Sequence, residues 1–366
     1  MLIVLIVGGW LWWHSGTTTP PAPEPEAAPP PPPTQEVAQP EPAPAIVQTQ
    51  APPPMVPVPA PRPVARTNSA PTSAPTFPDI FPRPVRNAFE AQLALARLGI
   101  SSGSLDGLIG PQTQAALRAF QQKEGLAVSG VLDLATKERL LLTAPPYTNY
   151  VVTSGDLARL QPLSGTWLGK SRQTALDFET ILELVAEKSL SHPNLIRRLN
   201  PSIDWNHLFA GTTLQIPDVA SPEPGVKAAF ATISLSGKTL QAFDANSNLI
   251  AHFPCSIAQR VEKRPVGELH VAVVAPNPNY TFDPDVFPES AEARQLKTKL
   301  IVPPGPNNPV GVAWIGLDRP GYGIHGTPGP EQVGRTESHG CFRLANWNAK
   351  YLVQLAWVGM SVYVEP

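Results

Sequence analysis

Proline crowds the first quarter of this chain, because residues 20–84 hold 24 of the 47 prolines in 366 residues. Ala, Glu, Thr and Gln stand between them, and such a composition cannot bury enough apolar surface to form a core. A segment of this kind is an extended, polyproline-like chain of up to ~3.1 Å per residue, so it could reach on the order of 100–200 Å. We expect residues 20–86 to be a disordered linker that acts as a spacer. A proline-rich ligand for a partner domain is the alternative.

The residues before this linker are apolar from Met1 to Trp13. Thirteen helical residues span about 20 Å, which is short of the ~30 Å hydrocarbon core of a bilayer. No Lys or Arg precedes the run and no small-residue cleavage site follows it, although a signal peptide would show both. We expect residues 1–19 to be a membrane anchor that starts upstream of Met1, or an incomplete signal segment. The tryptophans favour the anchor, since Trp prefers the membrane interface, and a buried N-terminal strand or helix is the alternative.

Charge and cysteine content exclude two other classes of protein. The chain has 27 basic and 29 acidic residues, a net charge of −2 and a pI near 6.4, without a basic run, so we expect no nucleic-acid partner. Two cysteines do not make a disulfide framework. Cys255 lies in the apolar segment His252–Ile257, where we expect a packed strand residue. A regulatory Cys255–Cys341 bridge is the lesser alternative.

The segment from Tyr322 to Arg343 holds two of the seven His and one of the two Cys. It reads Tyr-Gly-Ile-His-Gly-Thr, a polar turn-rich interval, and then Ser-His-Gly-Cys-Phe-Arg. The thiolate form of Cys is the nucleophile, and a neighbouring imidazole both lowers the thiol pKa from about 8.5 and removes the proton. Cys341 is therefore the candidate nucleophile of a covalent thiol mechanism.

Two histidines compete for the role of general base. His339 stands two residues before Cys341, so on a strand it shares the face of the thiol at roughly 6–7 Å, which is too far for a direct bond. His325 comes from a separate segment and can be folded to hydrogen-bond distance, which favours it as the base. Ser338 and the carbonyl of Gly326 are candidates to hold the other imidazole nitrogen.

The backbone around the thiol is a candidate oxyanion site. Gly340 has no Cβ, so backbone N–H groups at His339, Gly340 and Cys341 can approach a bound carbonyl. A buried, unreactive Cys341 and a zinc site with His325 and His339 are the alternatives. The flanking Ser, His and Gly are poor core residues, and the zinc set lacks an obvious fourth ligand. We therefore predict neither a metal nor a cofactor.

These residues carry a resemblance to a known family. His-Gly-Thr followed about a dozen residues later by Ser-His-Gly-Cys-Phe-Arg resembles the signature of the L,D-transpeptidase catalytic domain of bacterial cell-wall enzymes. The likeness includes Arg264–Leu269 and Pro303–Gly311 and covers roughly Val226 to Pro366. It implies that a Cys attacks the stem tetrapeptide of peptidoglycan between diaminopimelate and the terminal D-Ala, and that the acyl group passes to an amine. It assigns Cys341 as nucleophile and His325 as base, with Ser338, His339, Gly340 and Arg343 completing the signature.

Residues 226–366 otherwise read mostly as short strands with Gly and Pro turns, which indicates a curled, largely β sandwich with little helix. The family fold agrees with this pattern. The predicted strands are 230–235, 239–243, 249–257, 269–274, 312–315 and 361–364, and one helix is predicted over 346–355. Residues 275–310 are long for a connection, and such loops are usually functional. We expect a lid or acyl-donor groove there, with candidate substrate-binding residues Arg343, Tyr322, Asn308, Trp314 and Tyr280.

Residues 87–143 show three short amphipathic helices. The first ends at Gly99, the second begins at Pro111 and ends before Gly125, and the third begins after the N-cap Asp133. The pattern of Gly, Gln and apolar positions resembles the small three-helix peptidoglycan-binding domain. A structural bundle without binding activity is the alternative.

Residues 148–218 show a strand-like alternation over Tyr150–Asp156 that ends in a turn, then two helical patterns, and a closing strand at Gly211–Pro217. The second helix is expected to begin at the N-cap Ser191 and to stop at Asn200-Pro201. This order resembles a lysin-motif (LysM) domain, which binds N-acetylglucosamine chains. An insertion from about Ala158 to Phe178 departs from that pattern, so a pure spacer is the alternative.

The sequence therefore predicts a multidomain chain with an all-α three-helix domain, an α+β LysM-like domain and a mainly-β catalytic domain. The predicted function is an L,D-transpeptidase on the periplasmic side of the cell envelope, tethered by residues 1–13 or else secreted. Its partners are peptidoglycan stem peptides and glycan strands, the membrane, and a lipoprotein lysine as one acyl acceptor. The alternatives are an L,D-carboxypeptidase, in which water takes the acyl group, and a non-catalytic wall-binding protein.

Overall fold

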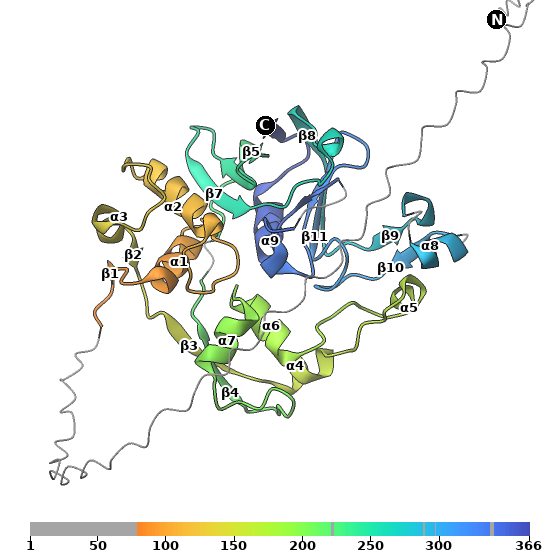
Figure 1. Cartoon of the computed structure of the whole chain (residues 1–366), viewed down its shortest axis with the longest axis horizontal. Helices are drawn as coiled ribbons and strands as arrows, with labels where there is room; N and C mark the ends of the chain where they lie inside the picture. Colours follow the sequence, from red (N-terminus) through yellow and green to blue (C-terminus); the bar gives the residue numbers. More distant parts are fainter. Residues whose placement is uncertain (1–78, 221–222, 288–289, 297, 337–339) are drawn as a thin grey trace, which may run out of the picture. The chain divides into compact units, whose positions relative to one another are not determined.

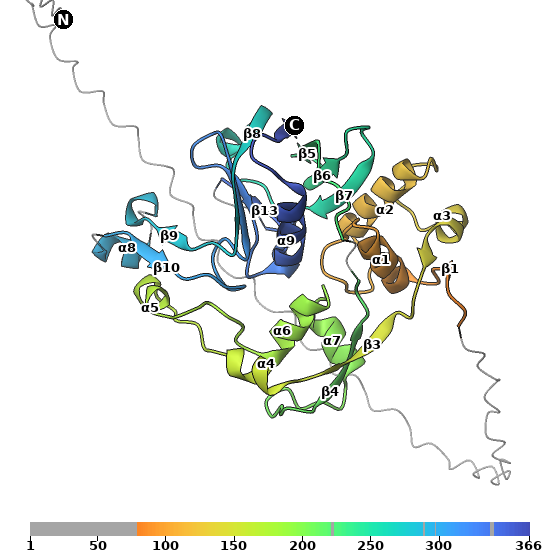
Figure 2. The same cartoon turned by 180° about the vertical axis from the view of Figure 1, so that it is seen from behind.

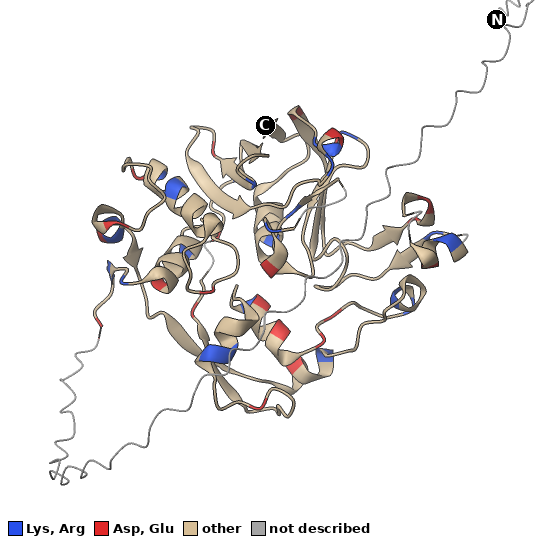
Figure 3. Cartoon of the chain, in the orientation of Figure 1, with Lys and Arg blue, Asp and Glu red and all other residues tan. Residues whose placement is uncertain are grey.

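The computed structural model describes residues 79–220, 223–287, 290–296, 298–336 and 340–366. The predicted N-terminal anchor and most of the proline-rich linker lie outside these residues. Within the described part of the chain, no helix is both long and apolar enough to span a membrane. Lys and Arg are dispersed over the elements rather than gathered on one of them (Figure 3).

The N-terminal helical segment is built from α1 (Ala88–Arg97), α2 (Pro111–Lys123) and α3 (Leu134–Arg139) (Figure 1). The local signals were correct: Pro111 is the first residue of α2, and the carboxylate of Asp133 accepts from the backbone N–H of Thr136 at 2.8 Å. Proline needs no N–H partner at that position, and an Asp N-cap satisfies one of the four free N–H groups of the first turn.

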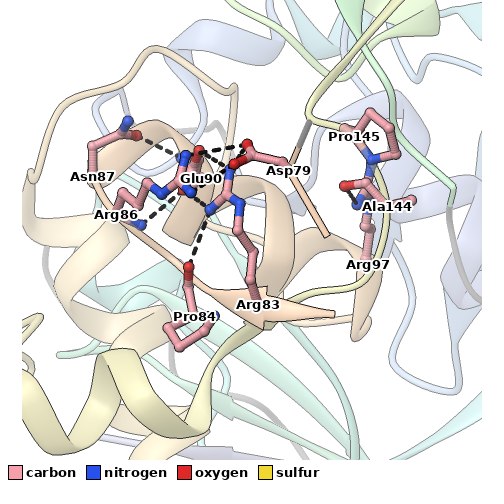
Figure 4. A network of polar contacts seen from close by, with 9 residues as sticks. All are labelled: Asp79, Arg83, Pro84, Arg86, Asn87, Glu90, Arg97, Ala144 and Pro145. Carbon is pink, nitrogen blue, oxygen red and sulfur yellow. Dashed lines mark hydrogen bonds and ion pairs between the residues drawn. The ribbon is translucent and has the colours of Figure 1, made fainter. Parts of the chain in front are cut away.

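This segment begins earlier than residue 87. The short strands β1 (Arg83–Pro84) and β2 (Leu141–Leu142) pair antiparallel. The guanidinium of Arg83 donates to both oxygens of the buried Glu90, at 2.7 and 2.8 Å (Figure 4). Asp79 also pairs with Arg83 at 3.1 Å. A bidentate Arg–carboxylate pair of this kind fixes geometry as well as charge, so the residues just before α1 are held against the helical segment.

The next segment closes on a pair of antiparallel strands, β3 (Tyr147–Val151) and β4 (Thr213–Pro217), with α4 (Ser154–Arg159), α5 (Trp167–Ser171), α6 (Ile181–Lys188) and α7 (Pro193–Leu199) between them. The turn predicted after the first strand is wrong, because Thr153 and Asp156 form a reciprocal capping box that starts α4.

The start of α7 also differs from the prediction. His192, not Ser191, is its N-cap: the imidazole Nδ1 accepts from the N–H of Asn194 at 3.1 Å. The Ser191 hydroxyl donates instead to the carbonyl of Ser189 at 2.7 Å. A local Ser signal was thus overridden by a competing local hydrogen bond.

The C-terminal segment is dominated by one eight-stranded mixed sheet with the order β13-β12-β11-β8-β14-β5-β6-β7. The strands are β5 (Phe230–Ser234), β6 (Thr239–Phe243), β7 (Leu249–Pro254), β8 (Gly267–Pro276), β11 (Ala313–Leu317), β12 (Gly323–His325), β13 (Phe342–Arg343) and β14 (Ser361–Glu365). The mainly-β, curled character was predicted correctly. The curl is strong enough that Ser256, just after β7, bridges Arg343 in β13, so the strands form a single sheet rather than the two of a sandwich.

Helix α9 (Asn346–Leu355) lies against this sheet, and the buried faces of the helix and sheet make the main core (Figure 2). The short 3-10 turn η1 (Val261–Lys263) precedes β8. The long connection predicted over 275–310 carries its own structure: the hairpin β9 (Tyr280–Phe282) and β10 (Leu300–Val302), with η2 (Pro284–Val286) and α8 (Ala291–Gln295) between its strands. A small separate core, Leu176, Phe282, Ala293 and Val302, joins this hairpin to the insertion that precedes α6.

Candidate active site

The His-Gly and Cys-Phe-Arg segments lie side by side on two short strands. β12 pairs antiparallel with β11 and parallel with β13, with Trp314 opposite His325 and His325 opposite Arg343. Side chains alternate between the two faces of a strand. Ile324 and Phe342, each 1% exposed, belong to the core. The other face therefore presents His325 and Arg343, and Cys341 immediately before β13 belongs to the same alternation.

His325 is buried and its imidazole is oriented by a single strong contact. Its Nδ1 lies 2.6 Å from the carbonyl oxygen of Gly326, which can only accept, so Nδ1 carries the proton and Nε2 is left with a free lone pair. Burial lowers the pKa of His325 to about 4, and the Arg343 charge adds to the effect. The imidazole is therefore neutral at pH 7 and able to accept a proton.

A tryptophan fixes the ring from the neighbouring strand. The indole of Trp314 stacks on the His325 imidazole with centroids 5.7 Å apart and planes 25° apart. This position requires a glycine at 323, since a Cβ there would lie 2.5 Å from the indole ring. Gly323 thus makes room for the group that holds the imidazole in place.

Cys341 is half-buried, and its sulfur donates weakly to the carbonyl of Gly321 at 3.6 Å. Burial raises the pKa of the Cys341 thiol, while the backbone of Gly323 and the charge of Arg343 oppose that rise. The resting site therefore holds a thiol and a neutral imidazole rather than a thiolate–imidazolium pair. A neutral thiol becomes a nucleophile only when the neutral imidazole removes its proton, which we expect when the substrate is bound.

The charge of Arg343 lowers the pKa of both cysteine thiols, against the effect of burial. Burial lowers its own pKa, and charge on Cys255 or on Cys341 would raise it. Its backbone exchanges two hydrogen bonds with Ser256, each 2.9 Å. Cys255 is fully buried, with its thiol pKa raised to about 12 by burial, as expected of a packed strand residue. Neither thiol is part of a disulfide, so the structure holds no Cys255–Cys341 bridge.

Asn346, the first residue of α9, organises the loops around the site and was missed in the sequence. Its side-chain oxygen accepts from the N–H groups of Thr327 (3.1 Å) and Val312 (3.2 Å). Its amide donates to the carbonyl of Pro306 (3.0 Å) and to the carboxylate of Glu187 (3.1 Å). Only an Asn at a helix start was visible in the sequence, and nothing there indicated these distant partners.

The other predicted substrate-binding residues divide into two groups. Tyr280, in β9, is half-buried, and a charge on Cys341 would raise the pKa of its phenol, so the two groups lie within electrostatic reach. Tyr322 is half-buried beneath Arg319, whose guanidinium lies 4.9 Å from the ring centroid. Asn308 is fully buried and bonds Pro303 and Val310 within its own loop, so it shapes that loop instead of lining a groove. Ser338 and His339 lie outside the described residues.

No group of three or more His, Cys, Asp or Glu that could hold a metal ion occurs in the described ranges. The polar groups that meet at this face are a thiol, an imidazole, a guanidinium and a phenol. These are groups for proton transfer, nucleophilic attack and binding of a carboxylate or carbonyl. The fold and this face define a thiol-bearing domain built on a curled sheet.

Comparison with known proteins identifies that domain. Residues 228–364 match the L,D-transpeptidase catalytic domain, and residues 87–140 match a peptidoglycan-binding domain. The C-terminal segment is therefore an L,D-transpeptidase catalytic domain, and the chain is a transpeptidase enzyme that also carries a peptidoglycan-binding domain.

Named relatives are of the same kind. The chain is 24% identical to L,D-transpeptidase YkuD of Bacillus licheniformis over 188 residues, which is 51% of this chain and 94% of that protein. It is 37% identical to L,D-transpeptidase YqjB of Bacillus subtilis over 105 residues, 27% of this chain and 51% of that protein. With L,D-transpeptidase ErfK/SrfK of Escherichia coli it shares 30% identity over 166 residues, 45% of this chain and 53% of that protein.

Solved structures with local likeness are also L,D-transpeptidases. One from Xylanimonas cellulosilytica aligns with 78% of this chain and 100% of its own, at 13% identity and a TM-score of 0.33. L,D-transpeptidase 3 of Mycobacterium tuberculosis aligns with 44% of this chain and 76% of its own, at 16% identity and a TM-score of 0.30. At such scores these likenesses add nothing to the argument, which stands on the sequence matches and on the described sheet.

Proposed function

We propose that Cys341 is the nucleophile and His325 the general base of peptidoglycan L,D-transpeptidation. The observation that carries the assignment is the Nδ1 contact of His325 with Gly326, which leaves Nε2 unprotonated on β12, and β12 pairs with the strand that begins directly after Cys341. The acyl donor is the stem tetrapeptide, cleaved between diaminopimelate and the terminal D-Ala. An amine is the acyl acceptor.

In the first half-reaction, Nε2 takes the thiol proton while sulfur bonds to the carbonyl carbon of diaminopimelate. The bond from that carbon to the D-Ala nitrogen breaks, and the imidazolium returns its proton to the leaving amine. In the second half, the acceptor amine attacks the thioester, its proton passes to Nε2, and sulfur leaves and is reprotonated. Backbone N–H groups at His339, Gly340 and Cys341 are proposed to stabilise the oxyanion of each tetrahedral intermediate.

Substrate contacts are assigned on the same face. Arg343 is proposed to bind a stem carboxylate, for which a guanidinium is suited. Tyr280, Tyr322 and Trp314 are proposed as walls of the donor groove, with Tyr280 reaching it from the hairpin β9–β10. Ser338 is proposed to support the imidazole alongside the carbonyl of Gly326.

The remaining modules are proposed to hold the enzyme at the sacculus, where they raise the effective concentration of substrate. The proposed domain boundaries are 1–19 for the anchor or signal segment, 20–86 for the linker, 87–143 for the helical domain, 148–218 for the LysM-like domain and 226–366 for the catalytic domain. The match to YkuD of Bacillus licheniformis supports a shared module upstream, because 188 residues are more than residues 228–364 can supply.

The proposed location is the periplasmic side of the cell envelope, with tethering to the membrane by the N-terminal segment. The acyl acceptor is another stem peptide, a lipoprotein lysine or a free D-amino acid. If water is the acyl acceptor, it hydrolyses the same thioester intermediate, and the enzyme is then an L,D-carboxypeptidase.

Mass spectrometry of the full chain, incubated with a carbapenem and separately with a disaccharide-tetrapeptide, tests the assignment. We expect one covalent adduct on the wild-type protein, release of D-Ala and formation of a cross-linked dimer, all lost in Cys341→Ala. Cys255→Ser is the matched control and should still form the adduct, because Cys255 is fully buried. A tripeptide product without dimer would indicate the carboxypeptidase, and an unchanged adduct in Cys341→Ala would refute the assignment.

The pH dependence of acylation gives a second prediction. Only a neutral His325 can accept the thiol proton, so acylation falls as pH drops through the pKa of this group, at about 4. The acid limb of kcat/KM should therefore lie well below the ordinary histidine value of about 6.5. In Arg343→Gln the limb should move to higher pH, because the cation that disfavours the imidazolium is gone. An acid limb that stays in place in this variant would contradict the assignment.

A further inference from the structure

The peptide group that links Gly326 to Thr327 is held at both of its ends. Its carbonyl accepts from Nδ1 of His325 at 2.6 Å, which is the contact that orients the imidazole. Its N–H donates to the side-chain oxygen of Asn346 at 3.1 Å. A peptide group is planar and moves as a unit. The side chain that holds the N–H end therefore also fixes the carbonyl that orients the imidazole.

The same Asn346 oxygen holds the strand that carries the stacking indole. It accepts from the N–H of Val312 at 3.2 Å, two residues before Trp314, whose ring lies on the imidazole. Gly311 and Gly326 make this close approach possible, because a Cβ at either position would overlap the Asn346 oxygen. Both supports of the imidazole, the carbonyl and the indole, thus depend on where one amide is held.

The nitrogen end of this amide is fixed by Glu187. Asn346 is fully buried, and its Nδ2 donates to the carbonyl of Pro306 at 3.0 Å and to the carboxylate of Glu187 at 3.1 Å. Two backbone N–H groups face the oxygen and a carbonyl faces the nitrogen, so the orientation of the amide is determined. Each N–H of Nδ2 has one acceptor, and removing Glu187 would leave one of them without a partner.

Glu187 comes from a different segment of the chain. It lies in α6, 159 residues before Asn346, and Figures 1 and 2 show α6 beside α9. Glu183, one turn earlier on the same face of α6, accepts from the side-chain amide of Asn307 at 2.6 Å. One face of α6 therefore directs two carboxylates at the catalytic domain, and Glu187 is the one that bonds Asn346.

We propose that Glu187 is a positioning residue for the catalytic imidazole. Through the amide of Asn346, it holds the peptide that orients His325, so the segment before the catalytic domain completes the support of the active site. The proposal rests on the proposed function, since it takes His325 as the general base. Glu187 itself touches neither the imidazole nor the thiol in this arrangement, and it acts through the hydrogen bonds of Asn346.

Two variants of similar size test the proposal in the full chain. Glu187→Leu removes the acceptor and keeps a good helix former, whereas Glu187→Gln keeps a neutral acceptor. Mass spectrometry of carbapenem acylation gives two quantities for each protein. These are the first-order rate at saturation and the carbapenem concentration at half-saturation.

In Glu187→Leu we expect the saturating rate of acylation to fall about tenfold, the kinetic equivalent of about 1.4 kcal/mol. The concentration at half-saturation should change by less than about twofold, because the lost interaction serves proton transfer and not binding. Glu187→Gln should keep the wild-type rate, since its side-chain oxygen can still accept from Asn346.

The imidazole supplies a readout that needs no substrate. Nuclear magnetic resonance of the wild type should show a protected Nδ1 proton of His325, assigned by its absence in His325→Gln. In Glu187→Leu, exchange of this proton with water should become roughly tenfold faster, as expected when the surrounding hydrogen bonds open more often. Glu187→Gln should match the wild type.

Glu183→Leu is the matched control. It removes a carboxylate from the same face of α6 and breaks the bond to Asn307, but it leaves the bond between Glu187 and Asn346 in place. The saturating acylation rate and the imidazole signal should therefore stay at their wild-type values, whatever the effect on the unfolding midpoint.

Equal losses in Glu183→Leu and Glu187→Leu would show that α6 only fastens the two segments together, and this would overturn the proposal. So would wild-type behaviour of Glu187→Leu, or a loss in Glu187→Gln as large as in Glu187→Leu. If the wild type forms no thiol adduct, the proposed function is refuted. The imidazole signal would then still decide whether Glu187 positions His325.

Discussion

The two segments that precede the catalytic domain are joined to it in different ways. The helical segment pairs with the edge of the sheet. The backbone N–H of His252 in β7 donates to the carbonyl of Gly99 at 3.0 Å, and its carbonyl accepts from the backbone N–H of Ser101 at 2.8 Å. Leu249 of β7 is buried in the core of the helical segment. This junction covers an open strand edge, which would otherwise be free to pair with another chain.

The segment Tyr147–Pro217 contacts the catalytic domain through side chains and through two backbone hydrogen bonds, from the N–H of Leu176 to the carbonyl of Pro304 (2.9 Å) and from the N–H of Asn307 to the carbonyl of Leu176 (3.0 Å). Its insertion places Trp167 on Phe282 of the hairpin β9–β10, with ring centroids 4.2 Å apart and planes 14° apart. The carboxylate of Glu292 accepts from the N–H groups of Trp167 and Leu168 at 2.9 and 3.0 Å. Figures 1 and 2 show α5 beside this hairpin from both sides. The contact holds a hairpin that carries Tyr280, one of the proposed groove residues.

The junction with the helical segment therefore supports the main sheet at β7. The junction at Trp167 instead positions the separate hairpin β9–β10 beside the site. The first should contribute to global stability, and the second to local order and catalysis. Three substitutions test this distinction.

Leu249→Ala should have the largest effect on stability. It removes a buried side chain shared between the helical core and β7, at a cost of about 2–4 kcal/mol. We expect far- and near-ultraviolet circular dichroism to report one common denaturation midpoint, lowered for both segments. Val266→Ala, at a 60% exposed position, is the control and should change little. Separate transitions for the two segments would show that this junction does not couple them.

Trp167→Ala should act locally. Loss of the stacked indole should raise hydrogen exchange in β9 and β10 by roughly tenfold, as a lost contact of about 1.4 kcal/mol would. Because the hairpin has its own small core, the global midpoint should move less than in Leu249→Ala. We expect a several-fold loss of kcat/KM for the tetrapeptide. Leu168→Ala, one residue further along α5, is the control, and equal exchange in both variants would contradict the positioning role.

Glu187→Gln should have the smallest effect, visible as a change in pH dependence. Burial raises the pKa of Glu187 to about 7, so its folded form favours the protonated acid. Its contribution to stability is full below the unfolded pKa of about 4.5 and is lost as pH rises through 7. The Gln variant should be more stable than the wild type at pH 8 and should lack this decline. Unfolding midpoints at pH 5 and pH 8 check the prediction, and parallel declines in both proteins would refute it.

Local chemistry explains which elements the sequence predicted. Pro111 and Asp133 mark helix starts because each acts on its own first turn. The thiol and imidazole were predicted as a reacting pair from residue type, from spacing and from the resemblance to the L,D-transpeptidase signature. By contrast, β12 and β13 have three and two residues, too few to show a period of two. Their pairing depends on partners distant in the sequence.

The insertion and Asn346 show the same limit. In the sequence nothing links Trp167 to its three aromatic neighbours in the structure, because these lie 113–120 residues further along the chain. A Cβ at Gly305 would clash with the backbone of Leu176, which lies more than 100 residues earlier in the chain. Such contacts follow from tertiary arrangement, and no local pattern encodes them.

The parallel pairing of β12 with β13 has a consequence for how this site could diversify. Two successive strands that run in the same direction need a long return. Residues 326–341 make that return here, and their described part includes the 3-10 turn η3 (Pro330–Gln332). The register of His325 opposite Arg343 is set by the ladder, so it does not depend on the length of that return. Insertions or deletions between Gly329 and Thr336 can therefore reshape the approach to the site while His325 and Arg343 keep their register.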